Sequence, residues 1–433
     1  MGLVAVVDPF STGAQLAAQA AKLGYGVVRV FSIWDSPVAA LIQEGVTVDY
    51  FATVQFNDQD PNVDEATNRC VRDLQNLPLP VVAVLPGAET GVELADRLAH
   101  RMRLRGNGEE GSFARRNKYD MGEKVRRSGT RAVKQRLCRS ESELTHYLTE
   151  ELGIPAPQPG KANQSGAERQ RCVVKPVQSA GSDCVYLCDT FEEAMEAFGL
   201  INGKRNGLGL INDGALVQEF LSGKEYVIDK VSKDGVHKVV AVWEYDKRVC
   251  NGHNFVYFGN RLRPADSPRA QEMIKYADAV LDALEIYQGP SHMEVMYTST
   301  GPCLVEVGSR CQGGEGTWIT IVEECIGYSQ VEVTMDVYMN GSLFDSLPKD
   351  TYTLKKAGRD VDLVSRHAGL VRSLPGDAVI RSLPSFRAVS WEIHPGDFCP
   401  MTIDCFTRPA CVQLVHDSEE QADRDFELLH ELE

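Results

Sequence analysis

The sequence has no long apolar run, no paired-cysteine motif and no basic segment at its start. No stretch approaches the roughly 20 consecutive apolar residues of a membrane-spanning helix, so we expect no membrane association. The chain enters the apolar run Leu3–Val7 directly, which is too short and too uncharged at its start for a secretory signal peptide. The 12 cysteines include no C-x-x-C pair, which predicts reduced thiols and a cytoplasmic location.

Positive charge is also scarce, because 45 Lys and Arg stand against 61 Asp and Glu and leave a formal net charge of −16. A field of that sign argues against a nucleic-acid partner. The exception is the segment 97–139, where basic residues outnumber acidic ones, but no aromatic ladder interleaves them for stacking on bases. A solvated helix face explains most of this segment, and Lys118 is the residue in it that we single out.

Two common phosphate-binding signatures are missing, since the chain has neither G-x-G-x-x-G after its first strand nor a Gly-Lys-Ser/Thr that opens a helix. The opening nevertheless alternates between strand and helix. Apolar residues 4–7 and 27–31 predict strands, residues 14–23 predict a helix between them, and residues 81–85 predict a later strand. This order favours a parallel sheet.

Breaks in the pattern suggest how the chain is divided. Gly106–Gly111 interrupts it near residue 110, and a loop at 155–166 separates a helical stretch from a strand at 172–175. After residue 345 short strands and turns return, and they end in an acidic helix at 418–432. A chain of this length has room for several buried cores, so we expect domains at 1–110, 111–340 and 341–433.

Two acids twelve residues apart, Glu294 and Glu306, are the most informative feature. Each lies in a short strand-like run, and residues 297–302 between the runs have the composition of a turn. The pattern predicts a hairpin with both carboxylates on one face. Like charges held so close repel, and a divalent cation such as Mg²⁺ with oxygen ligands removes that cost. Arg310 follows four residues later and suits a phosphate, whereas a solvated hairpin with surface acids is the plainer interpretation.

A lysine at the end of a strand precedes a loop of small residues, Lys175 before Ser179–Ser182. Such a loop can approach a polyphosphate with its backbone N–H groups, and lysine adds a flexible charge. A hairpin turn with a surface lysine is the alternative.

A third segment places acids around an apolar bend, with Glu219, Phe220 and Leu221 before a glycine and Glu225 after it. A bend of this kind can offer backbone groups to the edge of an adenine, apolar side chains to its faces and a carboxylate to ribose hydroxyls. A plain hairpin with exposed acids would have the same composition.

The order and rough spacing of these segments resemble the ATP-grasp superfamily, and more closely the carboxylate–amine ligases that include the bacterial L-amino-acid (dipeptide) ligases. The stretches Val7–Gly13, Gly289–Glu294 and Gly313–Gly314 also look like that group, so the resemblance covers nearly the whole chain. No single motif is specific, but their ordered occurrence is. The resemblance implies an α/β protein: an ATP-grasp fold preceded by a parallel-sheet, Rossmann-like N-terminal domain and followed by a small α+β C-terminal domain.

The resemblance also implies a role for each residue. Arg310 would be catalytic, by stabilising charge on the transferred phosphoryl group, and Glu294 and Glu306 would hold Mg²⁺, with Mn²⁺ as the alternative. The ATP-binding residues would be Lys118, Lys175, Ser179, Ala180, Gly181, Ser182, Glu219, Phe220, Leu221 and Glu225. The residues on the substrate side would be His292, Gly313, Gly314 and Ser11, and a packed histidine is the alternative for His292.

The implied activity joins a small-molecule carboxylate, activated as an acyl phosphate by ATP, to an amine, with release of ADP and phosphate. Amino acids are the expected substrates, and a homodimer is compatible with the sequence. One departure is Gly308, where many ATP-grasp enzymes have asparagine. It leaves open a non-catalytic ATP sensor or scaffold. An ATP-grasp enzyme that activates bicarbonate or a nucleotide precursor is less supported, because no biotin-carrier motif or fused amidotransferase is present.

Overall fold

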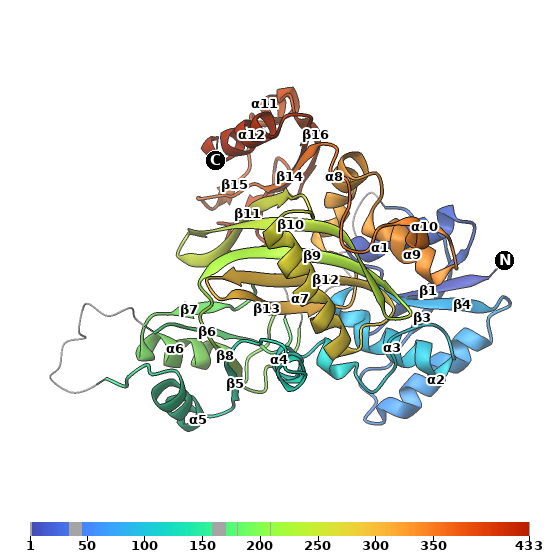
Figure 1. The fold of residues 1–433 in the computed structure, drawn as a ribbon, viewed down its shortest axis with the longest axis horizontal. Coiled ribbons are helices and arrows are strands. Elements are labelled where there is room, and N and C mark those ends of the chain that lie inside the picture. Colours follow the sequence, from blue (N-terminus) through green and yellow to red (C-terminus); the bar gives the residue numbers. More distant parts are fainter. Residues whose placement is uncertain (1, 34–45, 158–169, 180, 208, 433) are drawn as a thin grey trace.

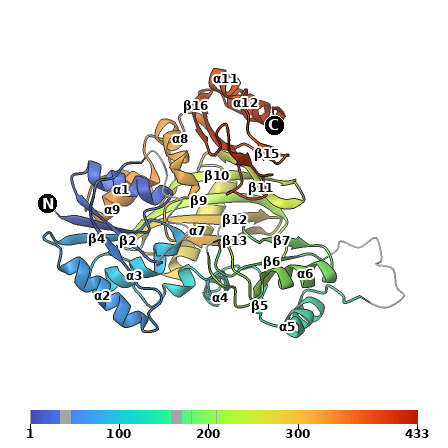
Figure 2. The same cartoon turned by 180° about the vertical axis from the view of Figure 1, so that it is seen from behind.

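The computed structural model describes residues 2–33, 46–157, 170–179, 181–207 and 209–432. Three sheets carry most of the chain, and Figure 1 shows them as a blue sheet on the right, a green sheet at the lower left and a large yellow-green sheet at the centre, which continues into the red C-terminal strands. Figure 2 gives the same arrangement from behind.

The first sheet is parallel, as the strand–helix–strand opening predicts, with the order β3-β2-β1-β4. Helix α1 begins two residues earlier than we expect from the sequence, at Thr12. Leu3, Ala5 and Val7 face α2 and α3 across a buried apolar cluster. The elements are β1(Leu3–Val7), α1(Thr12–Lys22), β2(Gly26–Phe31), β3(Tyr50–Gln55), α2(Val63–Gln75), β4(Val81–Pro86) and α3(Val92–Arg101).

The second sheet is small, with the order β5-β8-β6-β7 and antiparallel pairing throughout. Strand β6 ends at Lys175, as predicted, and most of the predicted loop at 155–166 lies outside the described residues. The elements are α4(Lys118–Arg127), β5(Gln135–Cys138), α5(Glu141–His146), β6(Cys172–Lys175), β7(Tyr186–Cys188), α6(Phe191–Ile201) and β8(Ala215–Glu219).

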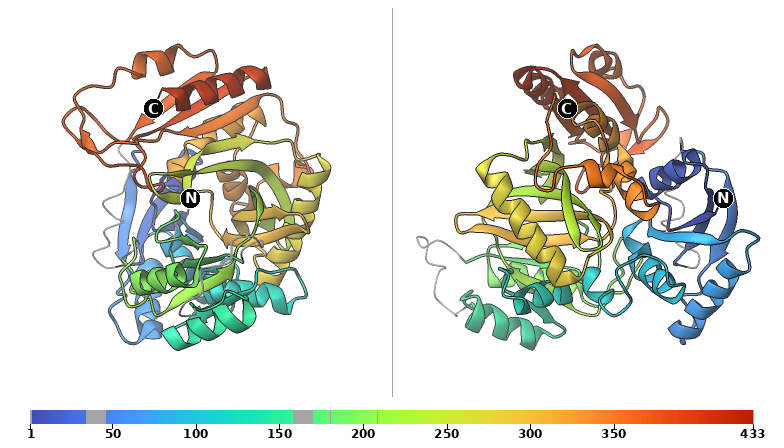
Figure 3. Two further views of the ribbon diagram at one scale, coloured as in Figure 1. Left: turned by 90° about the vertical axis from the view of Figure 1, so that its left-hand side faces the viewer. Right: turned by 45° about the vertical axis from the view of Figure 1, so that its right-hand side comes forward.

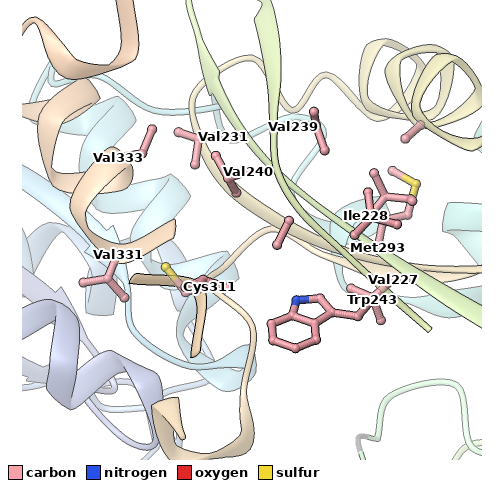
Figure 4. Close-up of a cluster of buried hydrophobic side chains, with 14 of the residues drawn as sticks. Val227, Ile228, Val231, Val239, Val240, Trp243, Met293, Cys311, Val331 and Val333 are labelled. Atoms are coloured by element: carbon pink, nitrogen blue, oxygen red, sulfur yellow. The ribbon is translucent and has the colours of Figure 1, made fainter. Parts of the chain in front are cut away.

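The third sheet has eight strands in the order β13-β12-β9-β10-β11-β14-β18-β16. Helix α7 covers one face of its first four strands (Figure 3). Side chains of β9, β10, β12 and α9, together with Cys311 from the loop after β13, belong to the buried cluster drawn in Figure 4. The elements are β9(Gly223–Lys233), β10(Val236–Cys250), β11(His253–Leu262), α7(Pro268–Leu284), β12(Gly289–Thr298), β13(Gly301–Gly308), α8(Trp318–Cys325), α9(Gln330–Tyr338) and α10(Leu343–Ser346).

Most strands after residue 341 join the third sheet, because β14, β18 and β16 extend it beyond β11, whereas β15 and β17 pair with each other in a small two-stranded sheet. The predicted acidic helix is α12, capped by the Ser418 side chain. The elements are β14(Ala357–Asp362), β15(Gly369–Leu370), α11(Asp377–Ser382), β16(Phe386–Trp391), β17(Phe398–Cys399), β18(Ala410–His416) and α12(Glu419–Glu431). Among the described residues no helix is long and apolar enough to span a membrane.

Candidate active site

The predicted hairpin is present, and its two acids lie directly opposite each other. Glu294 on β12 pairs with Glu306 on β13 in the antiparallel register, so both carboxylates leave the same face of the sheet. The strands run farther than predicted, to Thr298 and from Gly301, and leave only two residues for the turn. Glu294 is buried, whereas the side chain of Glu306 is 27% exposed. The interpretation as a solvated hairpin is therefore wrong for Glu294.

Two lysines face these acids from the small sheet and from α4. Lys118 Nζ lies 2.9 Å from Glu306 Oε2 and donates a hydrogen bond of 2.6 Å to the Ser179 carbonyl oxygen. Burial lowers the pKa of Lys175 to about 8, although the nearby Glu306 carboxylate opposes that shift. Burial also disfavours the charge on Glu306, but Lys118 and Lys175 outweigh it and hold its pKa below the usual range.

A first cavity opens between the small sheet and the eight-stranded sheet, where β8 passes into β9 through Phe220–Ser222. The alternative of a plain hairpin is wrong here, because β8 and β9 belong to different sheets. The Arg171 guanidinium lies 4.0 Å from the centre of the Phe220 ring. Ala180 lies outside the described residues, and the other predicted nucleotide-binding and metal-binding residues all line this first cavity: Lys118, Lys175, Ser179, Gly181, Ser182, Glu219, Phe220, Leu221, Glu225, Glu294 and Glu306.

Lys247, which no sequence motif predicted, also lines the first cavity. Its Nζ lies 2.7 Å from Glu225 Oε1, 3.8 Å from Glu294 Oε2 and 4.5 Å from the centre of the Tyr257 ring. Burial disfavours the charged form of Lys247, but the nearby carboxylates, Glu225 above all, outweigh burial and hold the pKa of Lys247 well above its ordinary value. Burial raises the pKa of Glu225 to about 7 in spite of that lysine. No sequence signal marks Lys247, because its partners lie on other strands.

A second cavity adjoins the first and shares Glu294 and Glu306 with it. Its lining includes the predicted catalytic and substrate-side residues Arg310, His292, Gly313, Gly314 and Ser11. The acids therefore form a wall between two spaces, one beside the lysines and the other beside Arg310.

Arg310 is held from the N-terminal part of the chain by an acid that the sequence analysis did not single out. Its Nε lies 2.8 Å from Glu89 Oε2, and the other oxygen of Glu89 lies 3.3 Å from Nη1 of Arg116. The glycine at 308 leaves room for this pair, because a Cβ there would lie 2.7 Å from Glu89 Oε2. The departure at Gly308 thus accompanies a carboxylate that approaches from the short helical turn after β4.

His292 is locked in place rather than loosely packed. Its Nδ1 lies 2.8 Å from Oδ1 of the fully buried Asp229, and its Nε2 lies 3.3 Å from the Tyr245 hydroxyl. That hydroxyl also donates to Glu294 Oε1 at 3.3 Å. The ring is thus both well packed and part of a polar chain that reaches the paired acids.

Ser11 and Gly313 join the end of the first sheet to the loop after Arg310. Ser11 Oγ accepts a 2.9 Å hydrogen bond from the Glu315 backbone N–H, and Thr12 Oγ1 donates to the Gly313 carbonyl oxygen at 3.2 Å. Trp318, at the start of α8, donates from Nε1 to the same carbonyl at 2.8 Å. These contacts bring the N-terminal part of the chain to the wall of the second cavity.

The lysines and the paired acids meet in a cleft between two antiparallel sheets, which is the arrangement of the ATP-grasp fold. Residues 138–314 match the ATP-grasp domain family. Over 419 residues it is 28% identical to dapdiamide A synthase of Enterobacter agglomerans, covering 96% of this chain and 92% of that protein. It is 22% identical over 263 residues to an L-arginine-specific L-amino acid ligase of Bacillus subtilis, covering 58% of each.

Solved structures resemble the whole chain. An L-amino acid ligase from Bacillus licheniformis superposes with a TM-score of 0.74 at 18% identity, covering 100% of this chain and 97% of that one. A carboxyaminoimidazole ribonucleotide synthase from Aspergillus clavatus, complexed with ATP, gives 0.69 at 14% identity, covering 100% and 98%. At these identities the likeness shows the fold.

Proposed function

We propose that this protein is an ATP-dependent carboxylate–amine ligase that joins amino-acid substrates through an amide bond and releases ADP and phosphate. The observation that carries the proposal is the pair Glu294 and Glu306, which forms a common wall between a lysine-lined cavity and a second cavity that holds Arg310. Similarity to dapdiamide A synthase along most of the chain, and to an L-arginine-specific L-amino acid ligase over 58% of it, supports the same conclusion.

In this proposal ATP occupies the first cavity. Lys118 and Lys175 neutralise phosphate oxygens, and the loop Ser179–Ser182 closes over them with backbone N–H groups. Phe220 and Leu221, with Glu219, contact the adenine, and Glu225 accepts hydrogen bonds from the ribose. Lys247 lies beside the proposed ribose site, where its ammonium group offsets the charge of the Glu225 carboxylate that it contacts.

A divalent cation accompanies ATP in ATP-grasp enzymes, and the donor set here fits one. Glu294 and Glu306 offer opposed carboxylate oxygens at the border of both cavities, which suits Mg²⁺ and also Mn²⁺. Among the described residues no group of three or more His, Cys, Asp or Glu is arranged to hold a metal by itself, so phosphate oxygens would complete the set. When bound, the cation offsets phosphate charge and orients the γ-phosphoryl group.

The residues of the second cavity then serve the transfer. A substrate carboxylate beside Arg310 attacks the γ-phosphorus in line, the bond from that phosphorus to the bridging oxygen breaks, and ADP leaves. The guanidinium stabilises the charge that spreads over the phosphoryl oxygens. A neutral amine attacks the resulting acyl phosphate, and phosphate leaves. The backbone N–H groups of Gly313 and Gly314 stabilise the tetrahedral oxyanion, and His292, oriented by Asp229, positions a substrate group. Enclosure of the acyl phosphate between the two cavities keeps water away from it.

All 12 cysteines are unpaired, 10 of them buried, so the proposal includes a reducing, cytoplasmic compartment.

A matrix of amino acids, offered as carboxylate and as amine with ATP and Mg²⁺, tests the proposal through ADP release and product mass. We expect at least one pair to give stoichiometric ADP, phosphate and amide. Glu306→Gln is the inactive reference, and Glu196→Gln, at an exposed position on α6, is the matched control. ATP binding without ADP formation across the matrix would favour the sensor or scaffold alternative.

A further inference from the structure

The second cavity extends past the paired acids to a polar floor that the proposed chemistry does not use. Asn260 on β11 lies opposite Tyr245 on β10 and opposite Asp360 on β14 in the antiparallel register. Directly paired residues present their side chains on one face, and all three line the second cavity. Gln312 lines the same cavity from the loop after Arg310.

Two amide side chains in this floor have no hydrogen-bond partner among the described residues. Asn260 and Gln312 are 8% and 5% exposed, and the buried oxygens Asn260 Oδ1 and Gln312 Oε1 accept no hydrogen bond. Within the described part of the chain neither amide nitrogen donates one. The position of Gln312 is nevertheless fixed, because its backbone N–H donates to Gln330 Oε1 at 2.9 Å. Unpaired buried amides cost free energy, so a bound group is expected to satisfy them.

The charged residues nearby define what that group is. Arg408 forms ion pairs with Asp362, at 2.7 Å, and with Glu315, so its guanidinium is not available to bind a ligand carboxylate. Asp360 contacts Thr317 Oγ1 at 2.9 Å and Cys411 Sγ at 2.9 Å, and burial together with Asp362 raises its pKa to about 6. A ligand carboxylate here would face Asp360 and Asp362, whereas an ammonium group would leave the amide donors unpaired.

We propose that this floor binds a carboxamide carried by the carboxylate substrate, with Asn260 and Gln312 paired to the amide and Asp360 accepting from its nitrogen. An uncharged group with a donor and an acceptor side by side complements an amide whichever way the protein amides are turned. The assignment falls on the carboxylate substrate because the same cavity holds Arg310, beside which that substrate is activated. The proposal therefore rests on the proposed function.

Probe acids of equal shape test it. L-asparagine, L-aspartate and L-leucine form one set, and L-glutamine, L-glutamate and L-homoleucine form a longer one, each offered as the carboxylate with L-alanine methyl ester as the amine. We expect kcat/KM for the carboxamide member of one set to exceed that of both isosteres by about tenfold or more, because an unmet buried donor discriminates strongly. Equal values in both sets would overturn the proposal.

Variants trace the preference to its source. Asn260→Leu and Gln312→Leu each remove an amide and keep its approximate shape, and we expect the carboxamide-to-apolar ratio of kcat/KM to fall toward one. Gln75→Leu, at an exposed position on α2, is the matched control and should keep the wild-type ratio. An unchanged ratio in both cavity variants, with normal melting curves, would place the preference elsewhere and overturn the assignment.

A binding measurement separates this proposal from the proposed function. The thermal shift of the wild-type protein with each probe acid, in the presence of a non-hydrolysable ATP analogue, reports affinity without turnover. A carboxamide-specific shift without ADP release would refute the ligase and keep the subsite. ADP release without carboxamide preference in either assay would keep the ligase and refute the subsite.

Discussion

Glu306 lines both cavities. It faces Lys118 at 2.9 Å and stands opposite Glu294 in the hairpin. We expect Glu306→Gln to abolish ligase activity, because a neutral amide cannot neutralise a cation as a carboxylate does, while the melting temperature stays near that of the wild type. ADP release at saturating Mg²⁺ together with a thermal melt measures both. Near-normal turnover would remove Glu306 from the metal site.

Lys175 gives the site a dependence on pH. Its pKa of about 8 means that the amine of the free protein is charged below that pH and neutral above it. A charged lysine binds phosphate, so ATP affinity should fall as pH rises from about 7 to about 9. Calorimetry at both values measures this, and Lys175→Ala should bind ATP weakly at both. Unchanged affinity and rate in Lys175→Ala would exclude Lys175 from the nucleotide site.

Arg310 should act mainly on the transition state. Loss of one charge contact made only there costs about 3 kcal/mol, or about a hundredfold in kcat, without a matching rise in KM. Arg310→Met tests this in steady-state kinetics, with a thermal melt as the control, because the variant also leaves Glu89 without its closest cation. A large fall in melting temperature with near-normal kcat would make Arg310 a structural residue.

At the scale of elements, the end of β13 is shaped by the absence of a side chain. A Cβ at Gly308 would lie 2.7 Å from Glu89 Oε2, a flexible atom that can move but only by leaving Arg310. We therefore expect Gly308→Ala to lower kcat by about tenfold or more with little change in melting temperature. Gly199→Ala on α6, where a Cβ meets nothing within 4 Å, is the matched control. Wild-type kcat in Gly308→Ala would show that the Glu89–Arg310 contact is dispensable.

The elements also explain what the sequence could predict. Glu294, Glu306 and Lys175 were recognisable because each belongs to a short run whose strand pattern and turn are local. Glu89, Lys247, Asn260 and Gln312 were not, because their meaning lies in contacts between segments far apart along the chain. Lys247 meets Glu225 across 22 residues, and Glu89, which follows β4 of the first sheet, meets Arg310, which follows β13 of the third.

At the scale of the whole molecule, the division into three domains stays a prediction, and the large sheet provides its test. Strand β11 pairs with β14 from beyond residue 341, and β14 and β18 pack against α8, so a chain ending at residue 340 would expose the edge of β11 and the face of α8 that these strands cover. We expect that chain to aggregate on expression, as measured by sedimentation. A soluble chain with ATP affinity like that of the full-length protein would mean that residues 341–433 are an independent unit.

The two cavities draw on different parts of the chain. Every residue that lines the first lies between Lys118 and Glu306, whereas the second also takes in Phe10–Thr12, Gly87–Glu89 and a set that runs from Asp360 to Arg408. If ATP occupies the first cavity as proposed, substitutions in these flanking segments would change which acids and amines are accepted without altering the residues that bind ATP. In evolutionary terms, related enzymes with this arrangement can come to make different amides while all of them continue to use ATP.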